Sequence, residues 1–299
     1  MEKINFYESQ KQKDPKQIFE NLERYVDMVI NRIQPSVLLT GGPGLGKTFM
    51  VKQRLDNKGF THGDQYRIIK GSTTAAGLYR ALYMNRGKII VFDDCDSVFK
   101  DNDGVNLLKG ALDSYDERWI SWISGNGALK DDDGHPIPSQ FQFTGSVIFI
   151  SNLSQKKIDS AIRSRSFTVD IELTPEQLLK RMEEKLPEME PKVPMSDKVA
   201  ALKCLSQVYQ KFEGVELNFR SLIKAIRIKR TGFDNWPQMV AEQCIDPNHN
   251  SSRKSTKKKD SITYTRAQLL AEKAKGKSWK TIEKELGITF GIRTKIIAG

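Results

Sequence analysis

Short apolar runs alternate with segments of helical periodicity over the first 170 residues of the chain. Runs of four or five apolar residues bounded by turn residues are typical of strands buried on both faces. They predict strands at 36–40, 66–71, 88–94, 146–151 and 167–173. Apolar residues at helical spacing predict helices at 15–33, 47–55, 75–85 and 105–115. Strands alternating with helices predict an α/β fold with a five-stranded, mainly parallel sheet covered on both faces.

The helix predicted at 15–33 carries a continuous apolar stripe. Pro15 suits its first turn, and Pro35 marks the exit of the chain toward the first strand. Residues three and four apart share one face of a helix. The face expected to be buried comprises Ile18, Leu22, Tyr25, Val26, Val29, Ile30 and Ile33.

Two segments with period-two alternation interrupt the strand–helix order. Residues 118–124 and 139–145 flank "GNGALKDDDGHPIP", which is turn chemistry almost throughout. This arrangement predicts a β-hairpin inserted at 118–145, immediately before the strand at 146–151.

The pattern becomes wholly helical after residue 174. Thr174, Pro175 and Gln177 form a strong helix start, with a threonine cap, a first-turn proline and a capping box. We expect an N-terminal helical segment at 1–35, an α/β core at 36–173 and a helical lid at 174–245. A basic linker at 246–263 and a small helical module at 264–299 would complete the chain.

The composition suits a soluble protein with a core of ordinary size. The chain has 299 residues, of which 38% are hydrophobic. Its longest apolar runs fall far short of the roughly 18 to 20 residues that a membrane span needs. The three cysteines lie far apart, the histidines and cysteines show no metal-ligand spacing, and no leader-like segment opens the sequence. A reducing, cytoplasmic location without membrane contact is expected.

The net charge of +11 is unevenly distributed. Residues 251–299 carry 13 Lys/Arg against 4 Asp/Glu, so that the remainder of the chain is close to neutral. A basic tail on a near-neutral body is typical of a chain that meets a polyanion.

The first predicted strand runs into a glycine-rich turn. The stretch "GGPGLGKT" has the spacing G-x-x-x-x-G-K-T between a strand and a helix. Glycines at these positions let backbone N–H groups surround a phosphate at a helix N-terminus. The lysine would reach the β- and γ-phosphates, and the threonine would help to hold Mg²⁺. The predicted phosphate site comprises Gly41, Gly42, Pro43, Gly44, Leu45, Gly46, Lys47 and Thr48.

A second acidic motif follows the third predicted strand. In "IIVFDDCDSVF" four apolar residues lead directly into Asp93 and Asp94. A buried strand that ends in carboxylates beside a phosphate loop predicts the metal half of a nucleoside-triphosphate site. Asp93, with Thr48, would hold Mg²⁺. Asp94 would face the water that attacks the γ-phosphate.

Five segments, in order, resemble the motifs of AAA+ ATPases over roughly residues 15–245. "GGPGLGKT" and "IIVFDDCD" resemble Walker A and Walker B, and "VIFISN" is similar to the sensor-one strand, with Asn152 as the water-orienting group. "IDSAIRSR" resembles the arginine-finger segment, where Arg165 is favoured over Arg163. "LNFRSLIKAIRI" resembles the sensor-two helix, with Arg220 as the γ-phosphate contact. The resemblance is nearest to AAA+ ATPases of large bacteriophages.

This resemblance implies an ATP hydrolase with ATP and Mg²⁺ as its ligands. An arginine finger acts on a neighbouring subunit, so the resemblance also implies a ring, with a hexamer as the expected size. Two departures stand out. Asp94 replaces the usual Walker B glutamate, and no aromatic pore loop follows the second strand. Tyr79 and Tyr83 are expected to pack in a helix.

The last 36 residues have the rhythm of a helix-turn-helix module. A helix at 266–275 would end at Gly276, and Ser278 would cap "WKTIEKEL" before a recognition helix. The groove-facing candidates are Thr289, Arg293, Thr294 and Lys295. The phosphate-contact candidates are Lys254, Lys257, Lys258 and Lys259. The alternative for this module is a protein-docking unit.

The sequence therefore favours an AAA+ ATPase that acts on DNA or on a protein bound to DNA. The expected protein partner is a client protein or a helicase. Three alternatives stay open. A superfamily-three ring helicase would also carry an aspartate pair and an inserted hairpin, where Lys130 or His135 would touch DNA. A nucleotide-gated DNA-binding switch would hydrolyse little ATP. Asp94, in place of the usual glutamate, is the feature that supports this alternative. A protein remodeller would use its tail to dock an adaptor.

Overall fold

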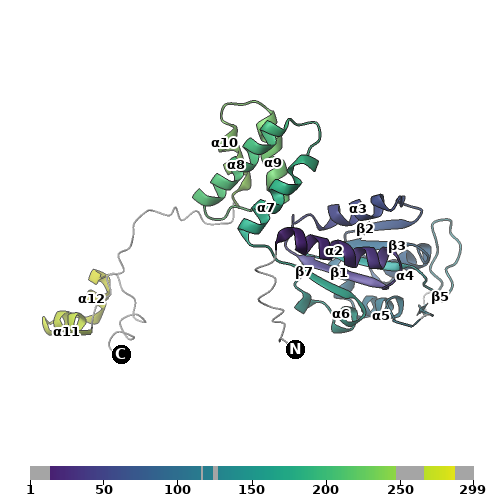
Figure 1. Ribbon diagram of the computed structural model, residues 1–299. Helices are drawn as coiled ribbons and strands as arrows, with labels where there is room; N and C mark the ends of the chain where they lie inside the picture. The colour runs from purple at the N-terminus through teal and green to yellow at the C-terminus, as the bar shows by residue number, and fades with distance from the viewer. Residues whose placement is uncertain (1–13, 116, 124–126, 247–265, 287–299) are drawn as a thin grey trace, which may run out of the picture. The chain divides into compact units, whose positions relative to one another are not determined.

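The structure is a computed structural model that describes residues 14–115, 117–123, 127–246 and 266–286. The chain divides into two compact units, residues 1–249 and 250–299. Each unit is described by itself. The first contains the sheet and most of the helices (Figure 1).

The larger unit is built on a five-stranded parallel sheet in the order β2-β3-β6-β1-β7. This confirms the predicted sheet, which is parallel at every pairing. The strand β6 lies between β1 and β3 and places the ends of the three side by side. The bounds are β1 (Ser36–Gly41), β2 (Tyr66–Lys70), β3 (Ile89–Asp93), β6 (Ser146–Ile150) and β7 (Phe167–Ile171).

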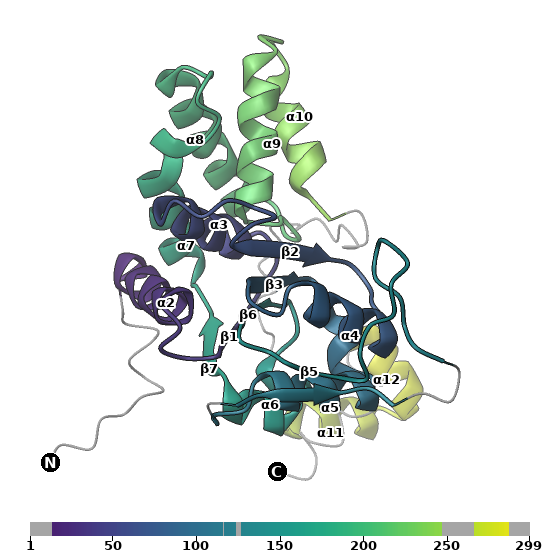
Figure 2. The ribbon, with the colours of Figure 1, turned by 90° about the vertical axis from the view of Figure 1, so that its right-hand side faces the viewer.

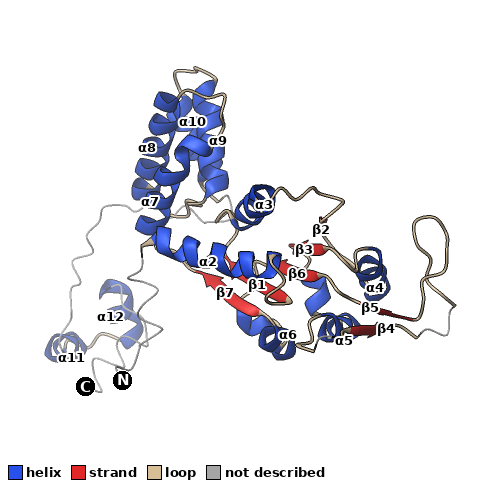
Figure 3. Ribbon diagram, turned by 45° about the vertical axis from the view of Figure 1, so that its right-hand side comes forward, coloured by secondary structure: helices blue, strands red, loops and turns tan. Residues whose placement is uncertain are grey.

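Alternate residues of the central strands enter two different cores. Val37 and Leu39 of β1 face one cluster, whereas Leu38 between them faces the other. The same alternation in β3 and β6 explains why these strands are apolar at every position. Figures 2 and 3 show α2 (Pro15–Ile30) and α3 (Lys47–Asn57) over one face of the sheet, opposite the helices of the other face. These are α4 (Ala75–Met84), α5 (Asn102–Ala111) and α6 (Ser160–Arg165).

The buried face of α2 differs from the predicted stripe at four positions, of which Ile18 is half-buried. Phe19, which was not predicted, is 3% exposed, whereas Tyr25 is 39% exposed and Ile33 is 66% exposed. Ile33 lies beyond the end of the helix, because the helix stops at Ile30. Leu22, Val26, Val29 and Ile30 are buried as predicted, and Phe19, three residues before Leu22, extends this face toward the start of the helix.

Helix α5 begins earlier and ends earlier than predicted from the apolar run at 105–115. Asp101 caps it, since its side chain accepts a hydrogen bond from the Asp103 backbone N–H at 3.3 Å. The last turn ends at Ala111 rather than Tyr115, which is 75% exposed. A short 3₁₀ segment, η1 (Asp96–Phe99), joins β3 to this helix.

The inserted hairpin is present but its strands are shorter than predicted. β4 (Trp119–Ser121) and β5 (Gln140–Gln142) pair antiparallel. The hairpin lies against α4, where the Tyr79 hydroxyl donates to the Pro138 carbonyl at 2.7 Å and the Tyr79 ring contacts Phe141 edge-on. Tyr79 and Tyr83 are thus packing residues of a helix, as expected.

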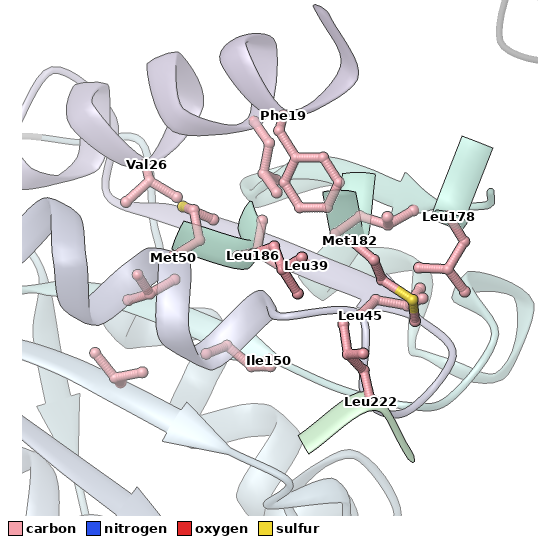
Figure 4. Packing of buried hydrophobic residues seen from close by; sticks show 14 of the residues in the cluster. Phe19, Val26, Leu39, Leu45, Met50, Ile150, Leu178, Met182, Leu186 and Leu222 are labelled. Atoms are coloured by element: carbon pink, nitrogen blue, oxygen red, sulfur yellow. The ribbon is translucent and has the colours of Figure 1, made fainter. Parts of the chain in front are cut away.

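The helical lid follows β7 directly. Thr174 and Gln177 form the predicted capping box at the start of α7 (Pro175–Lys185). The bundle continues with η3 (Leu186–Glu188), α8 (Met195–Lys211), α9 (Phe219–Arg230) and α10 (Trp236–Cys244). Its apolar core is continuous with that beneath α2 and α3. Figure 4 shows Met182, Leu186 and Leu222 of the lid among residues of α2, α3 and the sheet.

The smaller unit is described over two helices, α11 (Arg266–Ala274) and α12 (Trp279–Leu286). Leu269 and Ile282 are buried, and the Ser278 hydroxyl accepts from the Thr281 backbone N–H at 3.1 Å, as a cap does. The predicted recognition helix and the DNA contacts predicted for the tail lie outside the described residues. Within the described ranges, no helix is both long and apolar enough to cross a bilayer.

Candidate functional site

A cavity of about 360 Å³ lies where the carboxyl ends of β1, β3 and β6 meet the lid. Ligands of open α/β sheets bind outside this edge of the sheet. Its polar wall comprises Lys47, Thr48, Asp93, Asp94, Asn152 and Arg220, and the apolar wall includes Phe19, Met50, Met189, Phe219 and Ile223. The structure therefore brings together residues from four separate sequence motifs.

The glycine-rich turn has the backbone that the sequence demands. Gly41, Gly44 and Gly46 have φ angles of 139°, 71° and 86°, which favour glycine. Gly46 precedes α3 without a side-chain cap, so the first N–H groups of that helix have no side-chain acceptor from the cap position. This combination of a turn and an uncapped helix start suits an anion.

The Lys47 ammonium lies inside the turn. It donates to the carbonyls of Gly41 at 2.7 Å and Gly42 at 2.8 Å, and to Asn152 Oδ1 at 3.0 Å. Burial lowers the pKa of Lys47, an effect that the Asp94 carboxylate opposes and the nearby Arg220 reinforces. A bound polyphosphate would supply the negative charge that this buried cation lacks.

Asp93 is almost fully buried and is held at both oxygens. Thr48 Oγ1 donates to Asp93 Oδ1 at 2.8 Å, and Lys70 Nζ lies 2.7 Å from Asp93 Oδ2. A hydroxyl and a carboxylate brought together at the start of α3 are oxygen ligands that Mg²⁺ prefers. Lys70 was not predicted as a site residue. The sequence feature that could have identified Lys70 is a cation at the carboxyl end of a strand, beside the acidic pair.

Asp94 is exposed toward the cavity and adopts an unusual backbone conformation. Its φ is 56°, in the left-handed region where Asp and Asn occur more often than other residues that carry a Cβ. The Asn152 amide donates to Asp94 Oδ1 at 2.8 Å. Because Asn152 Oδ1 also accepts a hydrogen bond from Lys47, Asn152 connects Lys47 to the predicted water-activating carboxylate of Asp94.

The third acid of the motif has a different place. The Ser151 hydroxyl donates to Asp96 Oδ1 at 2.6 Å, which ties η1 to the end of β6. Ser151 immediately precedes Asn152, so this bond fixes the strand end that carries the amide. Of the three aspartates, two face the cavity and one anchors its frame.

The lid contributes Arg220 from the first turn of α9. Asn218 caps this helix through a capping box with Ser221, and the Phe219 backbone N–H donates to the Gly44 carbonyl at 2.8 Å. The lid is therefore bonded directly to the phosphate loop. Arg220 lines the cavity from this position.

A glycine-rich turn after β1, an acidic pair after β3, an asparagine after the strand between them and an arginine from a helical lid now stand around one cavity. The five-stranded parallel sheet and the order of these motifs resemble those of the AAA+ P-loop ATPases, as expected from the sequence.

Comparison with known proteins gives one relative by sequence and several by structure. No family model matches the chain. It is 30% identical over 169 residues to an uncharacterized 36.7 kDa protein from the nrdC-mobD intergenic region of Enterobacteria phage T4. The match covers 52% of this chain and 51% of the phage protein, so the chain spans about half the length of that relative. The phage source agrees with the phage resemblance expected from the motifs.

The similar solved structures include the Thermotoga maritima RuvB Holliday junction branch migration motor. It is 15% identical, with a TM-score of 0.45, over 76% of this chain and 68% of that one. A point mutant of the same protein is 13% identical, with a TM-score of 0.47, over 92% of this chain and 83% of the mutant. Nothing about the activity of this chain follows from similarity at this level.

The two candidate finger arginines are not among the residues that line this cavity. Arg163 and Arg165 form the last turn of α6, which ends where β7 begins, at the opposite edge of the sheet from the phosphate loop. Arg163 Nε donates to the Ile158 carbonyl at 3.2 Å. Within the described part of the chain, Arg165 Nε is buried without a hydrogen-bond partner. Both arginines are thus remote from the strand ends that form the cavity of their own chain.

The residues of the far wall of the cavity were not predicted from the sequence. Phe19, Glu23 and Gln53 come from α2 and α3, and Arg181 and Lys185 come from α7. The Arg181 guanidinium lies over the Phe19 ring, 4.3 Å from its centroid, and pairs with Glu184. The sequence feature that could have identified Arg181 is its place between the buried Leu178 and Met182, where helical spacing predicts an apolar residue.

Proposed function

We propose that this protein binds ATP with Mg²⁺ in the cavity between its AAA+ core and lid, and hydrolyses it. The convergence of Lys47, Asp93, Asp94, Asn152 and Arg220 on one cavity is the observation that carries this proposal. The residues fit the ligand. Among the described residues, the buried Lys47 ammonium has no carboxylate partner within hydrogen-bond distance, and Thr48 with Asp93 offers a pair of oxygen ligands.

Each residue has a distinct task in this proposal. The turn at 41–46 and Lys47 hold the phosphates, and bound Mg²⁺ would neutralise charge on them. Asp94 accepts a proton from the attacking water, and Asn152 orients Asp94 and that water. Arg220 brings the lid onto the γ-phosphate, so that the loss of this phosphate changes the contact between core and lid.

The apolar end of the cavity suits the base. Phe19, Met189 and Ile223 supply flat or flexible apolar surface, and Arg181 stacked on Phe19 adds a cation at its edge. Pockets for nucleobases combine such surface with a few polar groups. The position of Phe19 on α2 also explains why a helix that precedes the phosphate loop belongs to the nucleotide-binding unit.

We further propose a head-to-tail assembly of several copies. Arg163 and Arg165 lie at the edge of the sheet remote from their own cavity, as a group serving a neighbouring subunit would. An arginine supplied in trans raises the rate of phosphoryl transfer by about 10³- to 10⁵-fold in systems that use one. Closed rings are the usual outcome of such heterologous contacts.

The proposed target is DNA or a protein bound to DNA. The net charge of residues 251–299 and the two helices of the smaller unit support it. The first experiment measures steady-state ATP hydrolysis with and without DNA. It compares wild type, Asp94→Asn and a variant with alanine at Lys257, Lys258 and Lys259. Stimulation by DNA that is lost in both variants supports a DNA-coupled ATPase.

A near-zero rate in all three proteins, with ATP still bound, would replace this proposal by a nucleotide-gated switch. Asp94 is the observation that favours this second candidate, since the shorter acid stands where a glutamate is usual. DNA affinity that depends on bound ATP would then identify the switch.

A further inference from the structure

Lys70 stands beside the proposed metal site, although no motif includes it. It is the last residue of β2, and its ammonium lies 2.7 Å from Asp93 Oδ2. Lys70 and Asp93 are register partners on neighbouring parallel strands. The geometry of the sheet therefore places a cation next to the carboxylate that is proposed to hold Mg²⁺.

The backbone on both sides of this pair is tied together. The Cys95 thiol donates to the Ile69 carbonyl at 3.2 Å. Beyond the strands, the Thr73 backbone N–H donates to Ser97 Oγ at 3.2 Å. The segments that follow β2 and β3 thus hold each other, and the root of the Lys70 side chain is fixed relative to Asp93.

The two partners differ sharply in exposure. The Asp93 side chain is 4% exposed, whereas that of Lys70 is 65% exposed. A buried carboxylate without a partner is costly, so Asp93 needs a cation or donors at both oxygens. An exposed lysine loses little when it leaves, because its ammonium returns to water on a flexible stem. Release of Lys70 is therefore cheap only if another cation takes its place.

The other nearby donors do not serve this purpose. The Lys47 ammonium is occupied by the carbonyls of Gly41 and Gly42 and by Asn152. Thr48 is neutral and uses the other oxygen of Asp93. Lys70 is the recorded ion-pair partner of Asp93 among the described residues.

We propose that Lys70 is a built-in counter-ion that holds Asp93 in the absence of metal and gives way to the nucleotide-bound divalent cation. Lys70 is thus a positioning residue that sets how much Mg²⁺ the site requires. This inference rests on the proposed function, since it takes Asp93 as part of a metal–nucleotide site. It goes beyond that function by assigning a competing cation within the chain.

The test measures binding of ADP to the full chain by calorimetry over a range of MgCl₂ concentrations. It compares wild type, Lys70→Met, Lys70→Arg and Arg67→Met. Arg67 is the control, because it is an exposed cation on the same strand, three residues earlier. The readout is the MgCl₂ concentration that gives half of the increase in ADP affinity, which does not require hydrolysis.

Lys70→Met is expected to lower this concentration about tenfold, the lower end of what one opposite charge does to the proton affinity of a carboxyl group. Lys70→Arg and Arg67→Met are expected to remain within about twofold of wild type. Without nucleotide and in EDTA, Lys70→Met is expected to have a lower Tm than wild type, since Asp93 then lacks its counter-ion.

An unchanged or higher MgCl₂ requirement in Lys70→Met would overturn the inference while ADP still binds. Failure of wild type to bind ADP at any MgCl₂ concentration would instead overturn the proposed function, and the inference with it. The two failures are distinguishable, because ADP still binds in the first and binds to none of the four proteins in the second.

Discussion

The amide of Asn152 donates a hydrogen bond to Asp94 Oδ1 at 2.8 Å, from the end of one strand to the end of its neighbour. The oxygen of the same amide accepts from Lys47 at 3.0 Å. An asparagine side chain has one acceptor and one donor end, and here each end has its proper partner. The phosphate loop and the acidic pair are therefore linked through one side chain.

This link leads to the first prediction, for Asp94→Asn. The variant keeps the shape of the side chain but cannot accept a proton, so ATP turnover is expected to fall about 10²-fold or more. ADP affinity is expected to change only a few-fold, because the loop and Lys47 hold the phosphates. Steady-state hydrolysis and ADP calorimetry measure the two effects separately.

Asp103→Asn is the matched control for this variant. Asp103 is exposed on α5, outside the cavity, and its replacement removes the same charge. A control that loses as much activity as Asp94→Asn would mean that net charge, not the position of the carboxylate, limits the rate.

The second prediction concerns the backbone at Asp94, whose φ is 56°. Glycine adopts this conformation freely, whereas alanine pays about 1 kcal/mol or more. Asp94→Gly is therefore expected to be more stable than Asp94→Ala by about that amount. Both variants lose the carboxylate and its bond to Asn152, so the difference in urea unfolding isolates the backbone. Equal unfolding midpoints would contradict a strained conformation at this position.

The positions of the strands and motifs along the chain were predictable because local patterns determine them. Apolar runs identified the five strands, and the turn chemistry of "GGPGLGKT" identified the phosphate loop. Contacts between distant segments were not predictable in this way. The pairing of Lys70 with Asp93 depends on strand register, and the approach of Phe219 to Gly44 depends on how the lid folds back.

Helix faces and ends were the other weak point. The predicted stripe of α2 counted every apolar residue at helical spacing, yet Ile33 lies past the helix end and Tyr25 faces outward. Phe19 was missed although it serves both the core and the cavity. Capping by Asp101 moved the start of α5 three residues upstream of its first predicted position. Helix caps and the burial of individual side chains therefore determine the ends and buried faces of these helices, which periodicity alone does not predict.

The third prediction tests the contact between lid and loop with Gly44→Ala. A Cβ at this position would lie 2.8 Å from the Asn218 side chain, on a residue with a φ of 71°. The variant is expected to push α9 away from the loop and to weaken ADP binding more than about tenfold, since one misplaced helix end shifts several contacts.

Gly59→Ala supplies the control for that strain. Gly59 has a φ of 72°, and a Cβ there would meet nothing within 4 Å. The free energy of unfolding of Gly59→Ala is expected to fall by about 1 kcal/mol, because of the strained backbone alone. Its ADP affinity is expected to equal that of wild type. If both variants bound ADP as wild type does, the contact between lid and loop would have no part in binding.

The fourth prediction concerns the cysteines, which are all buried and unpaired. Burial raises the pKa of the Cys95 thiol to about 11, and it also raises the pKa of Cys204 and Cys244. A raised thiol pKa means that thiolate forms only at high pH. At pH 8 about 0.1% of Cys95 would be thiolate, against roughly a quarter of an ordinary exposed thiol.

Native protein is therefore expected to show no fast reaction with a chromogenic disulfide reagent at pH 8, and denatured protein is expected to show three reactive thiols. Rapid reaction of one thiol in the native state would indicate that the segment carrying it opens readily.

The last prediction separates Arg220, which lines the cavity, from Arg165, which lies at the remote edge of the sheet. Arg220→Ala is expected to weaken ATP binding in its own subunit. Arg165→Ala is expected to bind ATP normally and to lose hydrolysis, because the site that needs this arginine belongs to a neighbour. Arg163→Ala is expected to lose less activity, because the motif favours Arg165 as the finger. Both guanidinium groups donate to a backbone carbonyl of their own chain, at 3.2 Å for Arg163 and 3.3 Å for Arg165.

Mixing two inactive proteins then tests the assembly. Arg165→Ala has an intact Asp94, and Asp94→Asn has an intact Arg165, so one kind of mixed contact restores a complete site. Random equimolar exchange in a head-to-tail ring makes about a quarter of the contacts of this kind, which predicts recovery of about a quarter of wild-type hydrolysis. Mixing Arg220→Ala with Asp94→Asn is expected to restore less, because Arg220 acts within the subunit that binds the nucleotide. Absence of recovery in the first mixture, in proteins shown to exchange subunits, would place Arg165 outside the reaction.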